Sequence, residues 1–469
     1  MLTLFIALVV FLAVVLLLVA LLLWLRAKVM PEGDVTVTIN DDRTLTVPTG
    51  GTLIGTLAEQ GVHLPSACGG KGSCGQCRCR VVQGGGGILP TEQGFFSRRE
   101  QQEGWRLGCQ VKVKEDLSLK LPESILSIKE YECTVLSNRN VATFIKEFKV
   151  QLPAGEHMDF VPGSYAQIKI PTFRIPYSSF DRSLIGDEYL PAWEKFKMFD
   201  LVCVNTEPTV RAYSMANYPA EGDVFMLTVR IATPPRKKQP VAANSQFSIL
   251  NSQFENVNPG IASSYIFSLK PGDKVIMSGP YGDFHVKEHP APNSELRISN
   301  CEATQSNSEF NIQNSKLPEM IWIGGGAGMA PLRSQIMHLL RGGVNSQFST
   351  LNSQLPKMHY FYGARALNEV FYLQDFLQLE RDFPNFSFHL ALDRPDPAAD
   401  AAGVPYTPGF VHNVMYDTYL KDHPTPEDIE YYMCGPGPMS AAVTQLLDSL
   451  GVPPENICYD NFGDGAPTK

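Results

Sequence analysis

The chain has 469 residues, and at roughly 150 residues per domain this length allows about three domains. Lys and Arg total 39 and Asp and Glu total 48, so the formal net charge is −9, which argues against a nucleic-acid-binding protein. Hydrophobic residues make up 44% of the chain, enough to build cores and to argue against global disorder. Ten cysteines are too few for a disulfide scaffold, but five of them lie between Cys68 and Cys109, which indicates a metal site.

The N-terminal segment predicts a membrane anchor. Residues 2–25 read LTLFIALVVFLAVVLLLVALLLWL without a charge, and a helix of this length, about 36 Å, exceeds the hydrocarbon thickness of about 30 Å. Trp24 stands where an interfacial aromatic is expected, and Arg26 and Lys28 predict that the remaining chain is cytoplasmic. A cleaved signal peptide is the alternative, but it needs a basic start and a shorter apolar run. We therefore expect a single-pass anchor over residues 1–28 that contacts the lipid bilayer through residues 2–25.

Residues 33–123 predict a small β-rich domain. VTVTI and TLTV alternate apolar and polar residues around the turn Asn40-Asp41-Asp42, which is typical of a hairpin, and TLIGTLAEQG then predicts a short helix ended by Gly61.

A cysteine motif, C-x5-C-x2-C followed by a distant fourth cysteine, is the densest motif in the chain. Cys68, Cys74, Cys77 and Cys109 could hold a 2Fe–2S cluster, two thiolates on each iron, and the glycines between them allow a tight loop to turn N–H groups toward the sulfurs. Zinc is the competing interpretation, but structural zinc sites usually pair two short knuckles. Cys79 is expected to be a half-buried strand residue and not a ligand. This domain resembles the 2Fe–2S ferredoxins from end to end.

Residues 128–288 predict antiparallel strands and contain an Arg-x-Tyr-Ser motif at Arg211, Tyr213 and Ser214. With this motif the segment resembles the flavin domain, an antiparallel β-barrel, of the ferredoxin–NADP reductase superfamily. The resemblance implies FAD, with Arg211 on a phosphate, Tyr213 on the isoalloxazine face and Ser214 near the flavin N5. An ordinary strand with exposed polar residues is the alternative interpretation of such a short motif.

A second element of the same segment, GIASSY, agrees with the flavin interpretation. Gly260, Ser263 and Ser264 stand where a helix is predicted to begin, and free N–H groups at a helix start suit a pyrophosphate. The sequence SGPYGDF then closes the segment as it does in that superfamily.

Residues 318–469 predict an α/β domain with a parallel sheet. The strand Ile321–Ile323 leads into a glycine turn, a helix is expected after Pro331, and strands and helices then alternate. Glycines let a backbone approach a pyrophosphate, so the sequence predicts that NADH is bound here. The glycines of the turn are Gly324, Gly325, Gly326 and Gly328.

The C-terminal third carries further residues that the resemblance assigns to the nicotinamide site. Cys434, Gly435 and Pro436 resemble the CGPxxM motif that this superfamily places beside the nicotinamide, and Phe462 matches an aromatic that often covers the flavin. The alternative interpretations are that Cys434 is a buried strand thiol and that Phe462 is a final core aromatic. Arg365 follows the second strand as a single charge without a neighbouring Ser, which favours NADH over NADPH.

A Ser/Asn/Gln-rich decapeptide interrupts the C-terminal half of the chain. NSQFSILNSQ at 244–253 recurs as NSQFSTLNSQ at 345–354, with a degraded copy from Asn307. We interpret the inserts, near 240–257, 291–317 and 344–356, as surface loops that tolerate added length.

The order of anchor, ferredoxin domain, flavin barrel and nicotinamide domain resembles the electron-input subunit of the sodium-translocating NADH:quinone oxidoreductase family. The resemblance implies a bacterial inner-membrane protein that passes electrons from NADH through FAD and a 2Fe–2S cluster to other membrane subunits, which reduce quinone and pump Na⁺. Two alternatives stay open. One is an anchored reductase that serves an oxygenase, and the other is a non-enzymatic electron carrier.

Overall fold

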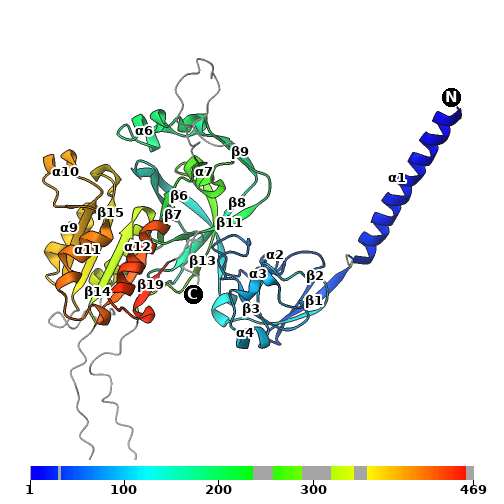
Figure 1. Ribbon diagram of the computed structural model, residues 1–469, viewed down its shortest axis with the longest axis horizontal. Helices are drawn as coiled ribbons and strands as arrows, with labels where there is room; N and C mark the ends of the chain where they lie inside the picture. Colours follow the sequence, from blue (N-terminus) through cyan, green and yellow to red (C-terminus); the bar gives the residue numbers. More distant parts are fainter. Residues whose placement is uncertain (1, 30–32, 236–256, 288–317, 343–355, 461–469) are drawn as a thin grey trace, which may run out of the picture. The chain divides into compact units, whose positions relative to one another are not determined.

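The computed structural model describes residues 2–29, 33–235, 257–287, 318–342 and 356–460 (Figure 1). The chain divides into two compact units, residues 1–130 and 131–469. The three Ser/Asn/Gln-rich inserts and Phe462 lie outside the described residues.

The N-terminal segment forms the helix α1, which spans Leu2–Val29. Apolar side chains along it are exposed, among them Phe5 at 65%, Phe11 at 66% and Leu17 at 68%. Among the residues whose side chains the structure describes, no helix is both long enough and apolar enough to cross a membrane.

The rest of the first unit is built on a five-stranded sheet. Its strands are β1 (Asp34–Ile39), β2 (Arg43–Pro48), β3 (Arg78–Gln83), β4 (Trp105–Leu107) and β5 (Leu117–Lys120). They lie in the order β2-β1-β5-β3-β4, with β1 and β5 parallel and the other pairs antiparallel. The short helices are α2 (Leu53–Glu59), α3 (Pro90–Gln93), α4 (Arg98–Gln102) and α5 (Glu123–Leu126).

Local sequence explains how this small domain begins. The predicted hairpin is present, and Asn40 and Asp41 make its turn at φ values of 52° and 64°, a left-handed region that these two residue types tolerate. The predicted helix is α2, whose N-cap residue Thr52 accepts the N–H of Gly55 with its hydroxyl. Leu53 and Leu57 of α2 are completely buried and join the sheet in one core.

The second unit begins with a six-stranded sheet. Its strands are β6 (Lys129–Ala142), β7 (Ile145–Gln151), β8 (Tyr165–Ile170), β11 (Thr209–Ser214), β12 (Val224–Arg230) and β13 (Lys274–Tyr281). They lie in the order β11-β8-β13-β6-β7-β12. A bridge between Met215 and Leu227 brings the two edge strands together, so the sheet closes into a barrel. A separate two-stranded antiparallel sheet pairs β9 (Phe173–Pro176) with β10 (Val202–Asn205), and the segment between these strands contains α6 (Leu190–Lys195). Helix α7 (Ile261–Ser268) precedes β13.

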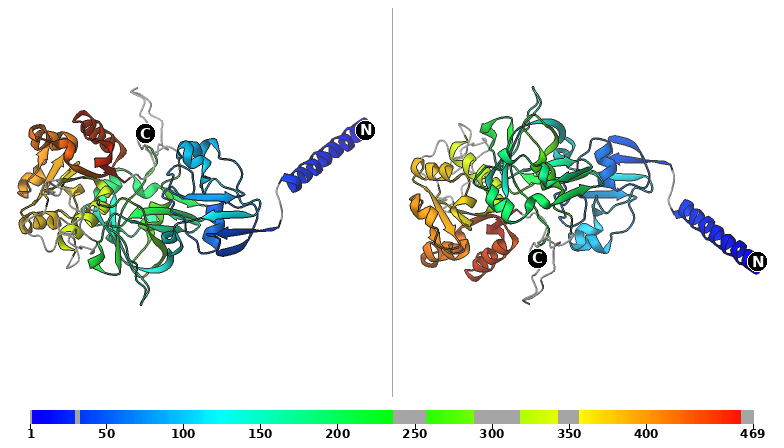
Figure 2. Two further views of the ribbon diagram at one scale, coloured as in Figure 1. Left: turned by 90° about the horizontal axis from the view of Figure 1, so that it is seen from below. Right: turned by 90° about the horizontal axis from the view of Figure 1, so that it is seen from above.

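The second unit ends in a parallel sheet with helices on both faces (Figures 1 and 2). Its order is β17-β16-β15-β14-β18-β19, and every pairing is parallel, as the alternation of elements predicts. The strands are β14 (Met320–Gly325), β15 (Met358–Ala364), β16 (Phe386–Leu392), β17 (Thr407–Pro408), β18 (Glu430–Cys434) and β19 (Ile457–Tyr459). The helices are α8 (Met329–Arg341), α9 (Leu373–Asp382), α10 (Pro397–Ala401), α11 (Val411–Thr418) and α12 (Gly437–Ser449).

Strand alternation decides which helices cover which face of this sheet. Met320 and Trp322 of β14 share a core with α8 and α9, whereas Ile321 and Ile323 share a second core with α11 and α12. This C-terminal part of the second unit therefore has three layers, and the carboxyl ends of its central strands β14 and β18 lie side by side.

Two details of the expected glycine turn were wrong. Gly324 and Gly325 belong to the end of β14, and α8 begins at Met329 instead of after Pro331. A proline is tolerated at the third position of a helix because the first N–H groups have no partner within the helix.

Candidate functional site

The four predicted ligand cysteines come together as two pairs. The Sγ atoms of Cys68 and Cys74 are 3.3 Å apart, and the thiols of Cys77 and Cys109 hydrogen-bond to each other. Among the described residues, no three or more His, Cys, Asp or Glu side chains converge on a single metal ion. Two pairs of thiolates are the arrangement that suits two irons, each with two cysteine ligands.

The loop between the first three cysteines needs glycine. Gly69, Gly70, Gly72 and Gly75 all have φ between 66° and 83°, where any other residue is strained. Backbone N–H groups of this loop reach the sulfurs, and the bond from the Cys74 thiol, together with these N–H groups, lowers the pKa of Cys68 to about 3. Donors that stabilise a thiolate also suit a cluster sulfur, so these residues fit a 2Fe–2S cluster.

Cys79 lies outside this group. It is completely buried on β3, its Sγ contacts the carbonyl oxygen of Arg106 at 3.7 Å, and burial raises the pKa of its thiol to about 12. Cys79 was expected to be half-buried, and it is completely buried instead.

A buried ion pair that the motif search missed supports the cluster loop. Arg106 is 5% exposed and Glu92 is 0% exposed, and the shortest of the contacts between them is 2.7 Å. Glu92 also accepts the N–H of Leu107 at 2.8 Å, two residues before the predicted ligand Cys109. No sequence motif signals this pair, because the partners are 14 residues apart on separate elements.

The Arg-x-Tyr-Ser motif forms β11. Arg211 and Tyr213 lie on the same face of this strand, since side chains alternate along it, and Ser214 ends it. Arg211 Nη1 donates to Thr209 Oγ1 at 2.8 Å and to the carbonyl oxygen of Val210 at 2.7 Å. Two side chains on one face can contact one flat ligand and its phosphate together, so this strand fits a flavin nucleotide.

The serines of GIASSY lie in the first turn of α7, after the N-cap residue Gly260. Ser263 Oγ donates to the Gly260 carbonyl oxygen at 3.1 Å, and Ser264 Oγ donates to the same oxygen at 2.7 Å and contacts Tyr177 Oη at 2.7 Å. Since these hydroxyls already have protein partners, the backbone N–H groups that begin the helix are what α7 offers to a pyrophosphate.

The glycine turn after β14 lies against the end of β18. A Cβ atom on Gly328 would stand 2.1 Å from the carbonyl oxygen of Cys434, and one on Gly435 would stand 2.5 Å from Met439 Cε. Gly326 has a φ of 57°. The turns that follow β14 and β18 therefore approach each other as closely as only glycine permits, which fits a site that holds a dinucleotide against backbone.

Asp460, a residue that the sequence did not indicate, links Ser214 to β18, the strand that ends at Cys434. Ser214 Oγ donates to Asp460 Oδ2 at 2.8 Å, and the Asp460 N–H donates to the Met433 carbonyl oxygen at 3.1 Å. Burial, reinforced by the Asp460 carboxylate, raises the pKa of the completely buried Cys434 thiol. No local pattern pairs Ser214 with Asp460, because 246 residues separate them.

Of the other predicted residues, two are described and exposed, and one is not described. Arg365 is exposed after β15, and Pro436 is the N-cap residue of α12. Phe462 lies outside the described residues.

Comparison with known proteins identifies the three domains. Family models match at residues 37–114 (2Fe-2S iron-sulfur cluster binding domain), 195–286 (oxidoreductase FAD-binding domain) and 322–445 (oxidoreductase NAD-binding domain). The chain is 45% identical over 459 residues to the F subunit of the Na(+)-translocating NADH-quinone reductase of Pseudomonas aeruginosa, with 98% of each chain covered. The chain belongs to this family of F subunits.

A second relative agrees with this family, and two solved structures share the fold. The F subunit of the Neisseria gonorrhoeae reductase is 45% identical and covers 94% of this chain and 95% of its own. The crystal structure of an Amycolatopsis cytochrome P450 reductase has a TM-score of 0.54 at 22% identity and covers 93% of this chain and 100% of its own. The ferredoxin reductase in carbazole 1,9a-dioxygenase has a TM-score of 0.51 at 19% identity and covers 92% of this chain and 99% of its own. At these identities the two structures show the shared fold alone.

Proposed function

We propose that this chain is the electron-input subunit of a sodium-translocating NADH:quinone oxidoreductase. It is an NADH dehydrogenase with binding domains for FAD, NADH and a 2Fe–2S cluster. The contact between Ser214 and Asp460 at 2.8 Å carries the proposal most directly, because it joins the end of the flavin-domain strand to the strand ends of the nucleotide sheet. Hydride transfer needs the two ring systems to meet at such a junction.

Residues of the barrel hold and orient the flavin. When bound, FAD accepts a hydride from NADH, and the 2Fe–2S cluster accepts electrons one at a time. Arg211 would neutralise a phosphate and Tyr213 would lie against the ring face. Ser214, whose single hydroxyl hydrogen is donated to Asp460, would accept a hydrogen bond near the flavin N5 through its oxygen. The first N–H groups of α7, after Gly260, hold the pyrophosphate.

Residues at the strand ends of the nucleotide sheet bind NADH. The turn after β14 and the start of α8 hold its pyrophosphate through backbone N–H groups. Cys434, Gly435 and Pro436 border the nicotinamide, and the buried neutral thiol of Cys434 excludes water there. Arg365, which follows β15, would stack on the adenine or bind the pyrophosphate of the nucleotide.

The cluster domain passes electrons onward. The two irons would be ligated by the two thiol pairs, Cys68 with Cys74 and Cys77 with Cys109. Other membrane subunits of the complex receive the electrons, reduce quinone and move Na⁺.

Helix α1 anchors the chain in the bacterial inner membrane as a single pass, with the other domains on the cytoplasmic side. Its 28 residues extend about 42 Å as a helix, its described apolar side chains are exposed, and Arg26 and Lys28 follow the apolar run. Membrane fractionation of the full chain and of a chain lacking residues 1–28 tests the anchor. We expect the full chain in the membrane fraction and the truncated chain in the soluble fraction, still oxidising NADH. A full chain that partitions like the truncated one would contradict the anchor.

A reductase of an oxygenase system is the second candidate, because the two similar solved structures belong to such systems. Co-purification separates the candidates, since an oxygenase partner would support the second and membrane subunits the first. A purely non-enzymatic carrier is tested with NADH and ferricyanide. The proposed function predicts ferricyanide reduction with NADH as donor, and an inactive flavin-loaded protein would refute it.

A further inference from the structure

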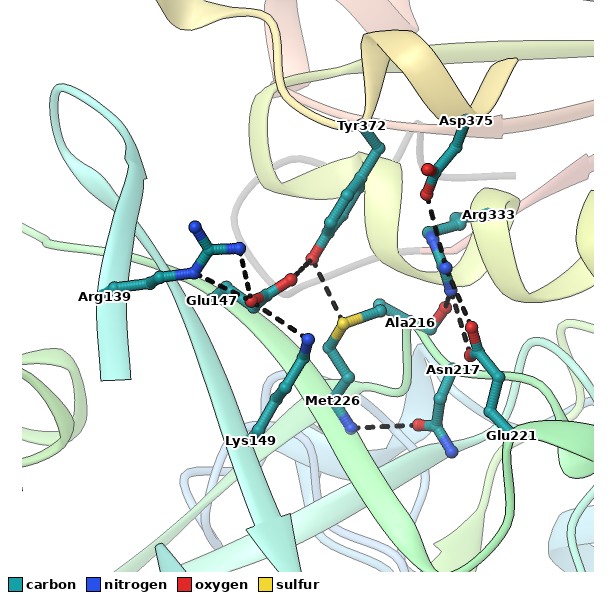
Figure 3. Close-up of polar contacts among 10 residues, drawn as sticks. All are labelled: Arg139, Glu147, Lys149, Ala216, Asn217, Glu221, Met226, Arg333, Tyr372 and Asp375. Atoms are coloured by element: carbon teal, nitrogen blue, oxygen red, sulfur yellow. Dashed lines mark hydrogen bonds and ion pairs between the residues drawn. The ribbon is translucent and has the colours of Figure 1, made fainter. Parts of the chain in front are cut away.

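A buried arginine connects the nucleotide domain to the flavin barrel (Figure 3). Arg333 lies in the second turn of α8 and is 6% exposed. Its Nη1 donates to the Ala216 carbonyl oxygen at 2.8 Å and to Glu221 Oε2 at 3.1 Å, and its Nη2 donates to Glu221 Oε1 at 2.9 Å. The guanidinium therefore binds both carboxylate oxygens of Glu221 in the planar, two-pronged geometry that a lysine does not reproduce.

The next residue of α8 extends this contact. Ser334 is completely buried, and its Oγ donates to the Asn217 carbonyl oxygen at 2.6 Å. Consecutive residues of α8 thus hold consecutive carbonyl groups of the barrel. Ala216 and Asn217 stand only two and three residues after Ser214, which ends β11 in the flavin site.

Tyr372 makes a second connection between the same two domains. Its ring lies under the Arg333 guanidinium at 5.0 Å, and its hydroxyl donates to Glu147 Oε2 at 2.8 Å. Glu147 lies on β7 with a side chain only 2% exposed, and Arg139 and Lys149 contact its other oxygen at 3.3 and 3.2 Å. Figure 3 shows the ring reaching from the start of α9 toward this carboxylate.

These connections begin at the segments that face the nucleotide. Arg333 is on the helix that follows the glycine turn, and Tyr372 immediately precedes α9, after β15. Tyr372 has a φ of 58°, a left-handed conformation that costs a bulky residue free energy and that its two partners help to hold. The network therefore connects the loops that would bind NADH to the strands that would bind the flavin.

We propose that Arg333 and Tyr372 are positioning residues, which fix the distance and angle at which the nicotinamide meets the flavin. The inference rests on the proposed function, and it adds a requirement for these side chains in hydride transfer though neither contacts the reacting atoms. A misplacement of about 1 Å can slow a reaction about 100-fold, so loss of the two-pronged contact should affect the transfer rate more than binding.

Stopped-flow reduction of the flavin by NADH in Arg333→Lys tests the proposal, with Arg341→Lys as the matched control. Arg341 lies on the same helix and pairs with Asp382 of α9 at 3.0 Å, so it contacts the nucleotide domain but not the barrel. For Arg333→Lys we expect a limiting rate about 10- to 100-fold lower, with the dissociation constant of NADH changed less than about threefold. Hydrogen exchange should also be faster in residues 214–222. Arg341→Lys should behave as the wild type.

Two results would overturn the proposal. One is a wild-type limiting rate in Arg333→Lys, and the other is a weaker NADH affinity at an unchanged limiting rate, which would make Arg333 a nucleotide-binding residue. If Arg333→Lys loses its flavin, Tyr372→Phe decides by the same criteria. Its control is Tyr406→Phe, because Tyr406 contacts Asp400 within the nucleotide domain. If NADH does not reduce the flavin of the wild-type protein, the proposed function itself is refuted.

Discussion

Replacing Glu92 with Gln should destabilise the cluster domain while leaving the flavin in place. Glu92 Oε1 accepts from Arg106 Nε at 3.0 Å and Leu107 N at 2.8 Å, and Oε2 accepts from Arg106 Nη2 at 2.7 Å and Leu89 N at 3.0 Å. A glutamine amide would point its NH₂ at two donors whichever way it turned. It would also leave the Arg106 charge buried without a counter-charge.

The expected cost follows from the burial of this pair. Breaking a buried ion pair from one side costs about 3–5 kcal/mol, and in a domain of this size each kcal/mol lowers the melting temperature by about 4–8 °C. We therefore expect the variant to lose its cluster absorbance at a temperature at least about 12 °C lower than the wild type does, with flavin absorbance unchanged. Glu103→Gln is the control, because Glu103 pairs with the 88% exposed Arg99 at 2.9 Å. Equal melting of the Glu92 and Glu103 variants would refute the reasoning.

Three further expectations concern single sites. Cys77→Ala should lose cluster absorbance and keep FAD, whereas Cys79→Ala should keep both, and bleaching of the cluster in Cys79→Ala would refute the ligand assignment. Steady-state kinetics should give a higher kcat/KM for NADH than for NADPH, and if the preference is reversed, Arg365→Ala shows whether Arg365 binds the 2′-phosphate. Burial lowers the pKa of His359 to about 3 and of His389 to about 4, helped at His359 by nearby positive charge. The unfolded chain already binds these protons near pH 6.5, so the unfolding free energy should decrease as the pH is lowered from about 6.5 to about 4. In urea titrations, His389→Gln should weaken this dependence of the unfolding free energy on pH.

The sequence predicted what depends on neighbours along the chain. The hairpin around Asn40, the cysteine loop and the alternating C-terminal elements follow from turn residues, short spacings and periodicity, and the structure contains all three. The start of α8 was misplaced because Pro331 was taken as a boundary, although a proline fits within the first turn of a helix.

Contacts between distant segments were beyond these patterns. Asp460 with Ser214, Glu92 with Arg106, and Arg333 with Glu221 each pair residues from different elements. A carboxylate in the sequence does not reveal whether an arginine will be buried against it, because tertiary packing decides the partner. The four cysteines could be predicted as ligands only because three of them lie within ten residues.

Anaerobic titration of the purified full-length protein with NADH, followed by its visible spectrum, tests the central claim most directly. The spectrum reports flavin and cluster in the same sample. The account predicts that NADH bleaches the flavin absorbance and also lowers the cluster absorbance without any added mediator. A flavin that NADH bleaches while the cluster absorbance stays unchanged would contradict the electron path from the nucleotide domain to Cys68, Cys74, Cys77 and Cys109.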